Sequence, residues 1–269
     1  MANLTFADAH VPGSESWTPE LTRIDHRSIP KSDYFPECHL SCWLADQGYP
    51  SEIFCLDRTG AIGLRQAYEV LIERLNLDAI VAVDGGVDSL MRGDEAGLGT
   101  PHEDALTLVA LDSARVERLL VCIGFGVDSF HGVCHAHFLE NVAALVRAKA
   151  FLGTISLLQE QPEACAYVQA VAYASQRCQG HASIVNTSIA AAVQGFYGDH
   201  HSTERTHADV LWINPLMALY WVFELQPVVD RLLYKDELRE TASVSDVFRV
   251  IEQVRENLEG KRPRTTIPV

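Results

Sequence analysis

Apolar residues recur along the chain with two different periods, which predict helices in some segments and strands in others. Over 64–75 they recur at helical spacing and predict a helix. The runs 77–83 and 119–123 are continuous and rich in β-branched residues, as in strands covered on both faces of a parallel sheet. Shorter strands are predicted at 2–7 and 54–56.

Each of the two long strands is followed by a glycine-containing loop and then by a predicted helix. Thr100, Pro101 and Glu103 supply an N-cap, a first-turn proline and a capping box for a helix over 101–112. A second helix is predicted over 131–150. Strand, loop and helix repeated in this order is typical of right-handed crossovers, so both loops should lie at one sheet edge and face one crevice.

Beyond residue 150 the strand signal fades and helical spacing dominates. Helices are predicted over 162–177, 183–194, 215–233 and 243–258. We therefore predict a single α/β domain over 1–269. It would have a Rossmann-like parallel sheet with flanking helices within 1–150 and a mainly helical part over 151–269.

The net charge of the chain limits the kinds of partner that the protein is expected to bind. The chain carries 21 basic and 36 acidic residues, a formal net charge of -15 at pH 7. This charge repels nucleic-acid phosphates, so no nucleic-acid partner is expected. A phosphorylated small molecule is still allowed, because loops and helix termini attract anions locally. The apolar run 210–225 is too short for a membrane span, so no membrane partner is expected either.

The cysteines indicate a reducing compartment. There are seven, an odd number, and some lie in apolar surroundings, as Cys122 does. Cys38 and Cys42 lack a second ligand pair nearby, which argues against a structural zinc site. The first ten residues have no basic region followed by an apolar stretch, so they do not form a secretory signal. We expect a cytoplasmic protein.

The chain repeats one short motif at the ends of its two long predicted strands. Gly-Val-Asp-Ser occurs at 86–89 and again at 126–129. Gly126 permits close approach of the backbone to a ligand, and Asp88 and Asp128 can bind hydroxyl groups or a cation. The alternative is a pair of turns in which the aspartates only cap the next segment.

The first of these loops concentrates acidic side chains. Asp84, Asp88, Asp94 and Glu95 fall within twelve residues, close to Gly85 and Gly86 as candidate ligand-binding positions. Such crowding raises at least one carboxyl pKa or recruits a divalent cation such as Mg²⁺, with Asp84 and Asp88 as candidate ligands. General acid/base catalysis uses the same arrangement, and the sequence does not separate the two. The alternative is a solvated acidic loop.

Candidates for ligand contacts and proton transfer also lie outside that loop. Thr100 starts a helix whose free N–H groups can bind an anion, although it is equally explained as a cap. His131 and His201 are candidate acid/base residues, against the alternative of hydrogen-bonded neutral histidines. Arg205 is a candidate anion contact in a glycine-bounded loop, against the alternative of a surface salt bridge.

The run from Val83 to Asp104 resembles the signature of a prokaryotic family known as domain of unknown function 1152. The segments 126–132, 195–201 and 214–216 extend the resemblance over most of the chain. It implies a Rossmann-like fold and no particular activity. Members of that family begin with an additional strand and a Gly-Gly-Gly-Asp loop, which are missing before Asn3. If the resemblance holds, it implies either a misassigned or a truncated start at Met1.

These patterns favour an enzyme that acts on a small molecule. The leading hypothesis is a hydrolase or transferase for a polar or phosphorylated metabolite, built on the carboxylate loop. The alternative is a non-catalytic metabolite-binding or sensor protein that uses the same crevice. A Gly-x-Ser-x-Gly elbow and a phosphate loop ending in Gly-Lys-Ser/Thr are both missing from the sequence. The oligomeric state stays open, with a homo-oligomer among the alternatives.

Overall fold

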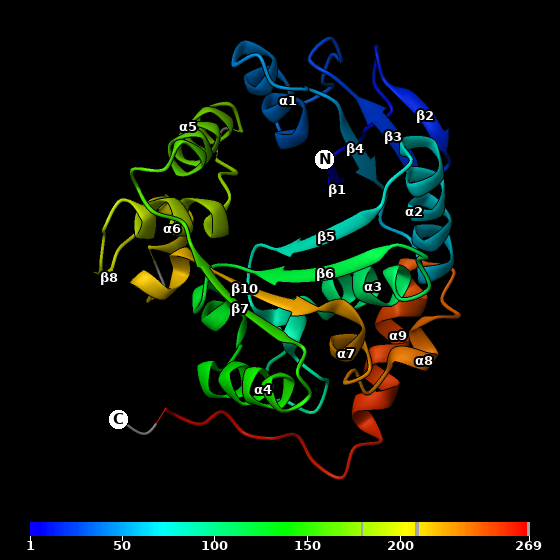
Figure 1. Ribbon diagram of the computed structural model, residues 1–269, viewed down its shortest axis with the longest axis vertical. Helices are drawn as coiled ribbons and strands as arrows, with labels where there is room; N and C mark the ends of the chain where they lie inside the picture. Colours follow the sequence, from blue (N-terminus) through cyan, green and yellow to red (C-terminus); the bar gives the residue numbers. More distant parts are fainter. Residues whose placement is uncertain (179, 208–209, 268–269) are drawn as a thin grey trace.

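The computed structural model describes residues 1–178, 180–207 and 210–267, which form a mixed α/β structure (Figure 1). Two four-stranded sheets organise it. The first contains, in spatial order, β1 (Ala2–Leu4), β4 (Ile53–Leu56), β3 (Leu21–Ile24) and β2 (Glu15–Thr18). The second contains, in spatial order, β5 (Ala79–Asp84), β6 (Glu117–Cys122), β10 (Leu219–Glu224) and β7 (Phe151–Ser156).

The second sheet is mixed rather than parallel throughout. Strands β5 and β6 are parallel, with Val83 opposite Val121 and Asp84 opposite Cys122. Strand β10 is antiparallel to both β6 and β7. The sequence predicted a helix over 215–233, and this is wrong because 219–224 form β10 within the sheet. The segment Leu-Tyr-Trp-Val-Phe-Glu is rich in aromatic and β-branched residues, which suit a strand.

Helices cover one face of the second sheet and flank its ends. The buried core joins strands β6 and β10 to side chains of several helices, which Figure 1 shows below and to the right of the sheet. These helices are α2 (Ala61–Leu75), α3 (Pro101–Leu111), α4 (His135–Arg147), α7 (Leu225–Val229), α8 (Lys235–Leu238) and α9 (Val244–Glu256). The predicted helices over 64–75, 101–112 and 243–258 are confirmed with small shifts of their ends.

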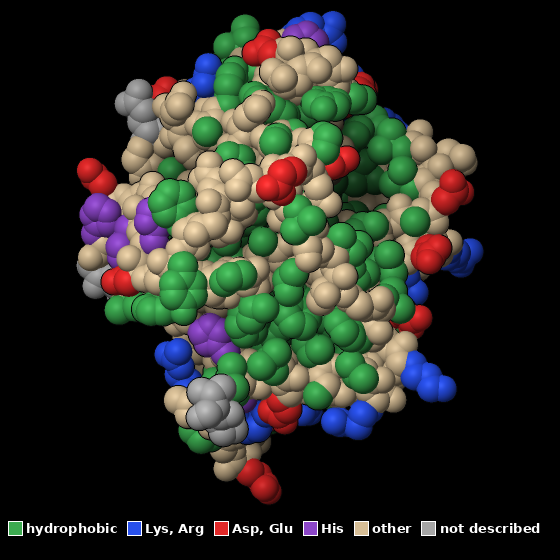
Figure 2. All heavy atoms as spheres, turned by 60° about the vertical axis from the view of Figure 1, so that its left-hand side comes forward, with side chains coloured by type: hydrophobic (Ala, Val, Ile, Leu, Met, Phe, Trp, Pro, Cys, Tyr) green, Lys and Arg blue, Asp and Glu red, His purple; other side chains and the backbone are tan. Residues whose placement is uncertain are grey.

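The opposite face is open along β5, which corrects one prediction. The sequence predicted a strand covered on both faces, but Val81 is 52% exposed and Val83 is 61% exposed. Ile80 and Ala82 pack against the core on the other face. Val81 and Val83 instead line the cleft that separates β5 from β1. Figure 2 shows hydrophobic side chains gathered over the middle of the molecular surface.

The remaining elements surround the ends of the two sheets. Helix α1 (Pro36–Asp46) packs against α5 (Pro162–Arg177), and α5 against α6 (Ile184–Val193). Beyond α6 the chain forms a two-stranded ribbon of β8 (Gly198–Asp199) and β9 (Trp212–Ile213). Within the described ranges, no helix has both the length and the apolar composition needed to cross a bilayer.

Candidate functional site

The loops after β5 and β6 meet at one edge of the second sheet, as the sequence predicted. The parallel pairing of these strands puts both of their carboxyl ends at that edge. The Val87 amide donates a hydrogen bond of 2.7 Å to Asp128 Oδ2. A β-carbon on Gly86 would lie 2.7 Å from the same oxygen, so the contact requires glycine there. The two repeated motifs therefore touch each other.

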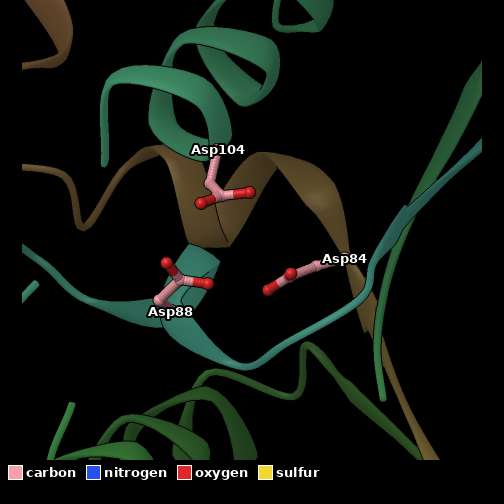
Figure 3. A group of neighbouring side chains, drawn as sticks. All are labelled: Asp84, Asp88 and Asp104. Atoms are coloured by element: carbon pink, nitrogen blue, oxygen red, sulfur yellow. The ribbon is translucent and has the colours of Figure 1, made fainter. Parts of the chain in front are cut away.

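Three aspartates converge at the first loop. Asp84 ends β5, Asp88 begins the 3-10 helix η1 (Asp88–Leu90), and Asp104 lies in the first turn of α3. Each offers one carboxylate oxygen, and these oxygens all lie within 4.8 Å of one another. Figure 3 shows the three carboxyl groups directed toward a shared space between their elements. The sequence analysis selected Asp84 and Asp88 but missed Asp104.

The hydrogen bonds that these aspartates accept are too few to stabilise three ionised carboxylates. Asp88 Oδ2 accepts hydrogen bonds from the Thr100 amide (2.6 Å) and hydroxyl (3.0 Å). The same hydroxyl lies 2.9 Å from Asp104 Oδ2, and its single proton serves one of these oxygens at a time. Asp84 Oδ2 accepts a hydrogen bond of 3.2 Å from the Ser89 amide. Protons or a cation would supply stabilisation that these hydrogen bonds do not give.

Burial and mutual repulsion make these groups retain protons. Burial, reinforced by the nearby Asp88 carboxylate, raises the pKa of Asp84 to about 7. Burial, with Asp88 and Asp84 as its charged neighbours, also raises the pKa of Asp104 well above its usual range. The pKa of Asp128 is raised by the same causes. The site is therefore protonated in part at neutral pH, and a bound cation would compete with those protons.

The Thr100 side chain forms hydrogen bonds with the aspartates instead of capping its helix. The sequence predicted that Thr100 and Glu103 form a capping box, but the Thr100 side chain makes no cap hydrogen bond in the described chain. Its hydroxyl faces Asp88 and Asp104 instead. Glu103 lines the cleft beside Asp104. The Thr100 side chain thus joins the start of α3 to Asp88, in addition to the backbone hydrogen bonds of the first turn.

Asp94 and Glu95 lie in a separate network around Arg262. The Arg262 guanidinium Nη2 is 2.9 Å from Asp94 Oδ1 and 2.9 Å from Glu95 Oε1. Glu95 is 0% exposed and also accepts hydrogen bonds from the amides of Arg92 and Gly93. Burial alone would raise the pKa of Asp94, but the hydrogen bond from Arg262 lowers it. These two carboxylates are neutralised by a residue distant in sequence and do not join the aspartate cluster.

The second loop is bordered by His135 rather than His131. The chain forms the 3-10 helix η2 (Val127–His131) where the sequence predicted the start of a helix over 131–150. A β-carbon on Gly126, whose φ is +96°, would lie 2.7 Å from His135 Nε2. Burial lowers the pKa of His135, which favours a neutral ring. His131 is exposed and packs against Phe130 with ring centroids 4.4 Å apart and the rings tilted by 44°.

The remaining candidates lie in the segment between α6 and β9. His201 Nδ1 is 2.9 Å from the Thr206 hydroxyl, and its Nε2 is 3.2 Å from Asp199 Oδ1. Arg205 donates a hydrogen bond of 2.9 Å to the carbonyl oxygen of Ala182 and lines a second cleft. His201 therefore has partners within its own loop, and Arg205 belongs to a different depression from the aspartates.

A cleft gives solvent access to the aspartate cluster. It has a volume of about 480 Å³ and lies between β1 and β5. Asp84, Gly85 and Asp104 line it, together with apolar side chains of both strands and of α2 and α3. Largely apolar walls around a few converging polar groups are typical of small-molecule sites. The arrangement can therefore bring a ligand to the carboxyl groups.

Comparison with known proteins gives one result. The family described as "Protein of unknown function (DUF1152)" matches residues 18–258, which include the whole aspartate cluster. A search of curated proteins and a search of solved structures found no match.

Proposed function

The chain belongs to the DUF1152 family, and from its own residues we propose that it is a cation-dependent enzyme. Asp84, Asp88 and Asp104 would hold one divalent cation such as Mg²⁺. The reaction would be hydrolysis or group transfer on a polar or phosphorylated metabolite bound in the cleft between β1 and β5. The observation that carries this proposal is the convergence of three carboxylate oxygens within 4.8 Å.

The spacing supports a single cation. Opposite ligands of Ca²⁺ at about 2.4 Å are about 4.8 Å apart, and those of Mg²⁺ at about 2.1 Å are about 4 Å apart. Oxygens no more than 4.8 Å apart can therefore close around one Ca²⁺ or Mg²⁺ ion with small movements of the side chains. A Mg²⁺ ion held by few carboxylates keeps open positions for water and substrate phosphate. It would polarise the phosphate and orient an attacking group.

The protein's own side chains would handle protons. With a pKa of about 7, Asp84 is suited to accept or donate a proton near neutral pH when no cation is bound. Asp128, which accepts a hydrogen bond from the Val87 amide, would hold the two loops together around the substrate. The Thr100 hydroxyl would orient Asp88 and Asp104 toward the cation.

Binding of Mn²⁺ tests the proposal directly. We expect one Mn²⁺ per chain by calorimetric titration, and an affinity at least tenfold lower in Asp84→Asn because one charged ligand is lost. Asp94→Asn is the matched control, since Asp94 pairs with Arg262 outside the cluster. Unchanged Mn²⁺ binding in Asp84→Asn would refute the cation site. A screen of phosphorylated metabolites with and without EDTA then separates turnover from binding alone, the outcome expected of a sensor protein.

Three further expectations accompany this proposal. The β5, α3 and β6 unit, with its parallel strands, would be the Rossmann-like part of the fold. The seven cysteines are free, which suits a reducing cytoplasm. Exposed apolar side chains such as Leu152 and Ile155 of β7 would support a homo-oligomer, because apolar patches on a surface commonly mark interfaces. Light scattering at several protein concentrations measures that association.

A further inference from the structure

A second cleft adjoins the first one on the other side of β1. It has a volume of about 600 Å³ and is lined by residues of α1, α5 and α6 and by Arg205. Residues 1–4 and Phe6 line both clefts, so the two depressions share a wall. Most of its lining is apolar, and the few polar side chains include Tyr34, Glu37 and Arg205. This is the composition of a site that orients a small polar ligand.

Glu37 places a buried carboxylate at this cleft. It lies in the first turn of α1 and is only 5% exposed. Its Oε1 accepts a hydrogen bond of 2.6 Å from Asn3 Nδ2. Its Oε2 is buried and has no hydrogen-bond partner among the described residues. A buried carboxylate oxygen without a donor is unfavourable, so a cationic donor at this position would be strongly favoured.

Arg205 brings the opposite charge to the same cleft. One of its guanidinium nitrogens donates to the Ala182 carbonyl oxygen at 2.9 Å, which holds the side chain in place. A guanidinium carries five N–H donors, so several are left for a ligand. Neither Arg205 nor Glu37 forms a salt bridge with another described residue, and they do not pair with each other. The cleft thus holds two charges of opposite sign apart.

Tyr34 lines the same cleft and lies within the electrostatic influence of both charges. Burial raises the pKa of Tyr34, the Glu37 carboxylate raises it further, and the Arg205 guanidinium opposes this effect, so both charges act on the Tyr34 oxygen. The Tyr34 ring meets His181 edge to face, with ring centroids 5.4 Å apart. An aromatic side chain in the same cleft as a carboxylate and a guanidinium suits the aliphatic part of a ligand that is charged at both ends.

We propose that this second cleft binds a zwitterionic small molecule whose ammonium group is held by Glu37 and whose carboxylate is held by Arg205. Two separated, unpaired charges of opposite sign are complementary to a ligand with the reverse arrangement. A purely anionic ligand would leave Glu37 without a donor, and a purely cationic one would leave Arg205 without an acceptor. The site uses none of the aspartates and stands independently of the proposed cation site.

A series of ω-amino acids measures the separation of the two charges. The probes are glycine, β-alanine, 4-aminobutyrate, 5-aminopentanoate and 6-aminohexanoate, each compared with the amine and the carboxylic acid of the same length. Binding is measured by calorimetry in EDTA, so that cations make no contribution. We expect one chain length to bind at least tenfold more tightly than both of its singly charged analogues.

Two substitutions test which residue binds each end of the ligand. In Glu37→Gln the zwitterion should bind no better than the carboxylic acid, and in Arg205→Gln no better than the amine. Arg177→Gln is the control, because Arg177 lies over the Tyr173 ring and does not line the cleft. Equal binding of zwitterions and singly charged analogues overturns the proposal, as does an advantage that persists in both variants. Mn²⁺ affinity should be unchanged in Arg205→Gln, so failure of this site is distinguishable from failure of the cation site.

Discussion

At the scale of single residues, Asp84 is the clearest case of a side chain altered by its position. A solvated aspartate is ionised at neutral pH, but Asp84 is only partly exposed and ends a strand beside Asp88 and Asp104. Its charged form is therefore unfavourable unless a cation compensates it. Crowded carboxylates of this kind are more common at functional sites than elsewhere.

Because the folded-state pKa of Asp84 is about 7 and its ordinary value is 3.8, its ionisation destabilises the folded protein. The stabilisation that the protonated Asp84 side chain gives to the folded state is fully present below about pH 4 and is lost as pH rises toward 7. We expect the stability of the cation-free wild type relative to Asp84→Asn to fall across this window. The limiting slope is about 1.4 kcal/mol per pH unit. Urea denaturation at a series of pH values measures it.

Saturating Mn²⁺ serves as the control for this pH experiment. The ion binds the deprotonated carboxylates, so it should remove or reverse the decline of wild-type stability with pH. A wild type that gains stability relative to Asp84→Asn as pH rises without metal would contradict the assigned ionisation.

The sequence identified part of this site at the residue scale. Asp84 and Asp88 were found because they follow a strand that could be recognised from its apolar run. Asp94 and Glu95 were grouped with them because they are near in the chain, but Arg262, 168 and 167 positions away, pairs with both. Asp104 was missed because a first-turn acidic residue is equally explained as a helix-end preference. Distant pairing partners are not visible in local patterns.

At the scale of elements, Gly99 joins η1 to α3 and allows Asp88 to approach Thr100. Its φ is +67°, and a β-carbon there would lie 2.1 Å from Asp88 Oδ2. We expect Gly99→Ala to displace Asp88, to destabilise the protein by more than the roughly 1–2 kcal/mol of a left-handed alanine, and to weaken Mn²⁺ binding at least tenfold. Urea denaturation and Mn²⁺ titration provide the two readouts.

Gly195→Ala is the matched control for this substitution. Gly195 also has a positive φ, +85°, but a β-carbon there would meet no atom within 4 Å. This variant should show the conformational cost alone and keep its Mn²⁺ affinity. If the two variants behave alike, Asp88 does not depend on the space that Gly99 leaves.

The elements themselves were predicted where their pattern was long and locally consistent. Helices α2 to α6 and α9 were recognised, as were strands β1 and β4 to β6, with shifted ends for α4 and β1. Strand β7 was missed, and β10 was taken as part of a helix because apolar residues flank it on both sides. Its pairing with β6 and β7 decides its conformation, and that pairing is a tertiary effect.

At the scale of the whole molecule, the C-terminal segment binds the loop after β5 and connects it to the rest of the fold. Glu95 and Arg262 form a backbone bridge, and Arg262 also pairs with Glu140 of α4. We expect Arg262→Ala to destabilise the protein by about 3–5 kcal/mol, because the fully buried Glu95 loses its cationic partner. Urea denaturation measures the loss.

Two variants test that interpretation. Lys261→Ala alters the neighbouring exposed residue and should change stability by no more than about 0.5 kcal/mol. Adding Glu95→Gln to Arg262→Ala should restore part of the lost stability, since it removes the uncompensated charge. A double variant no more stable than Arg262→Ala would show that the charge of Glu95 is not the cause.

The insertion of β10 between β6 and β7 has a consequence for how the protein is made. A ribosome releases β6 and β7 long before residues 219–224 emerge. Until then the facing edges of these two strands lack their partner, and such edges are prone to pair with other chains. Completion of this sheet must therefore be a late event in biosynthesis. A nascent polypeptide arrested before Leu219 should be a better chaperone client than one released after Glu224.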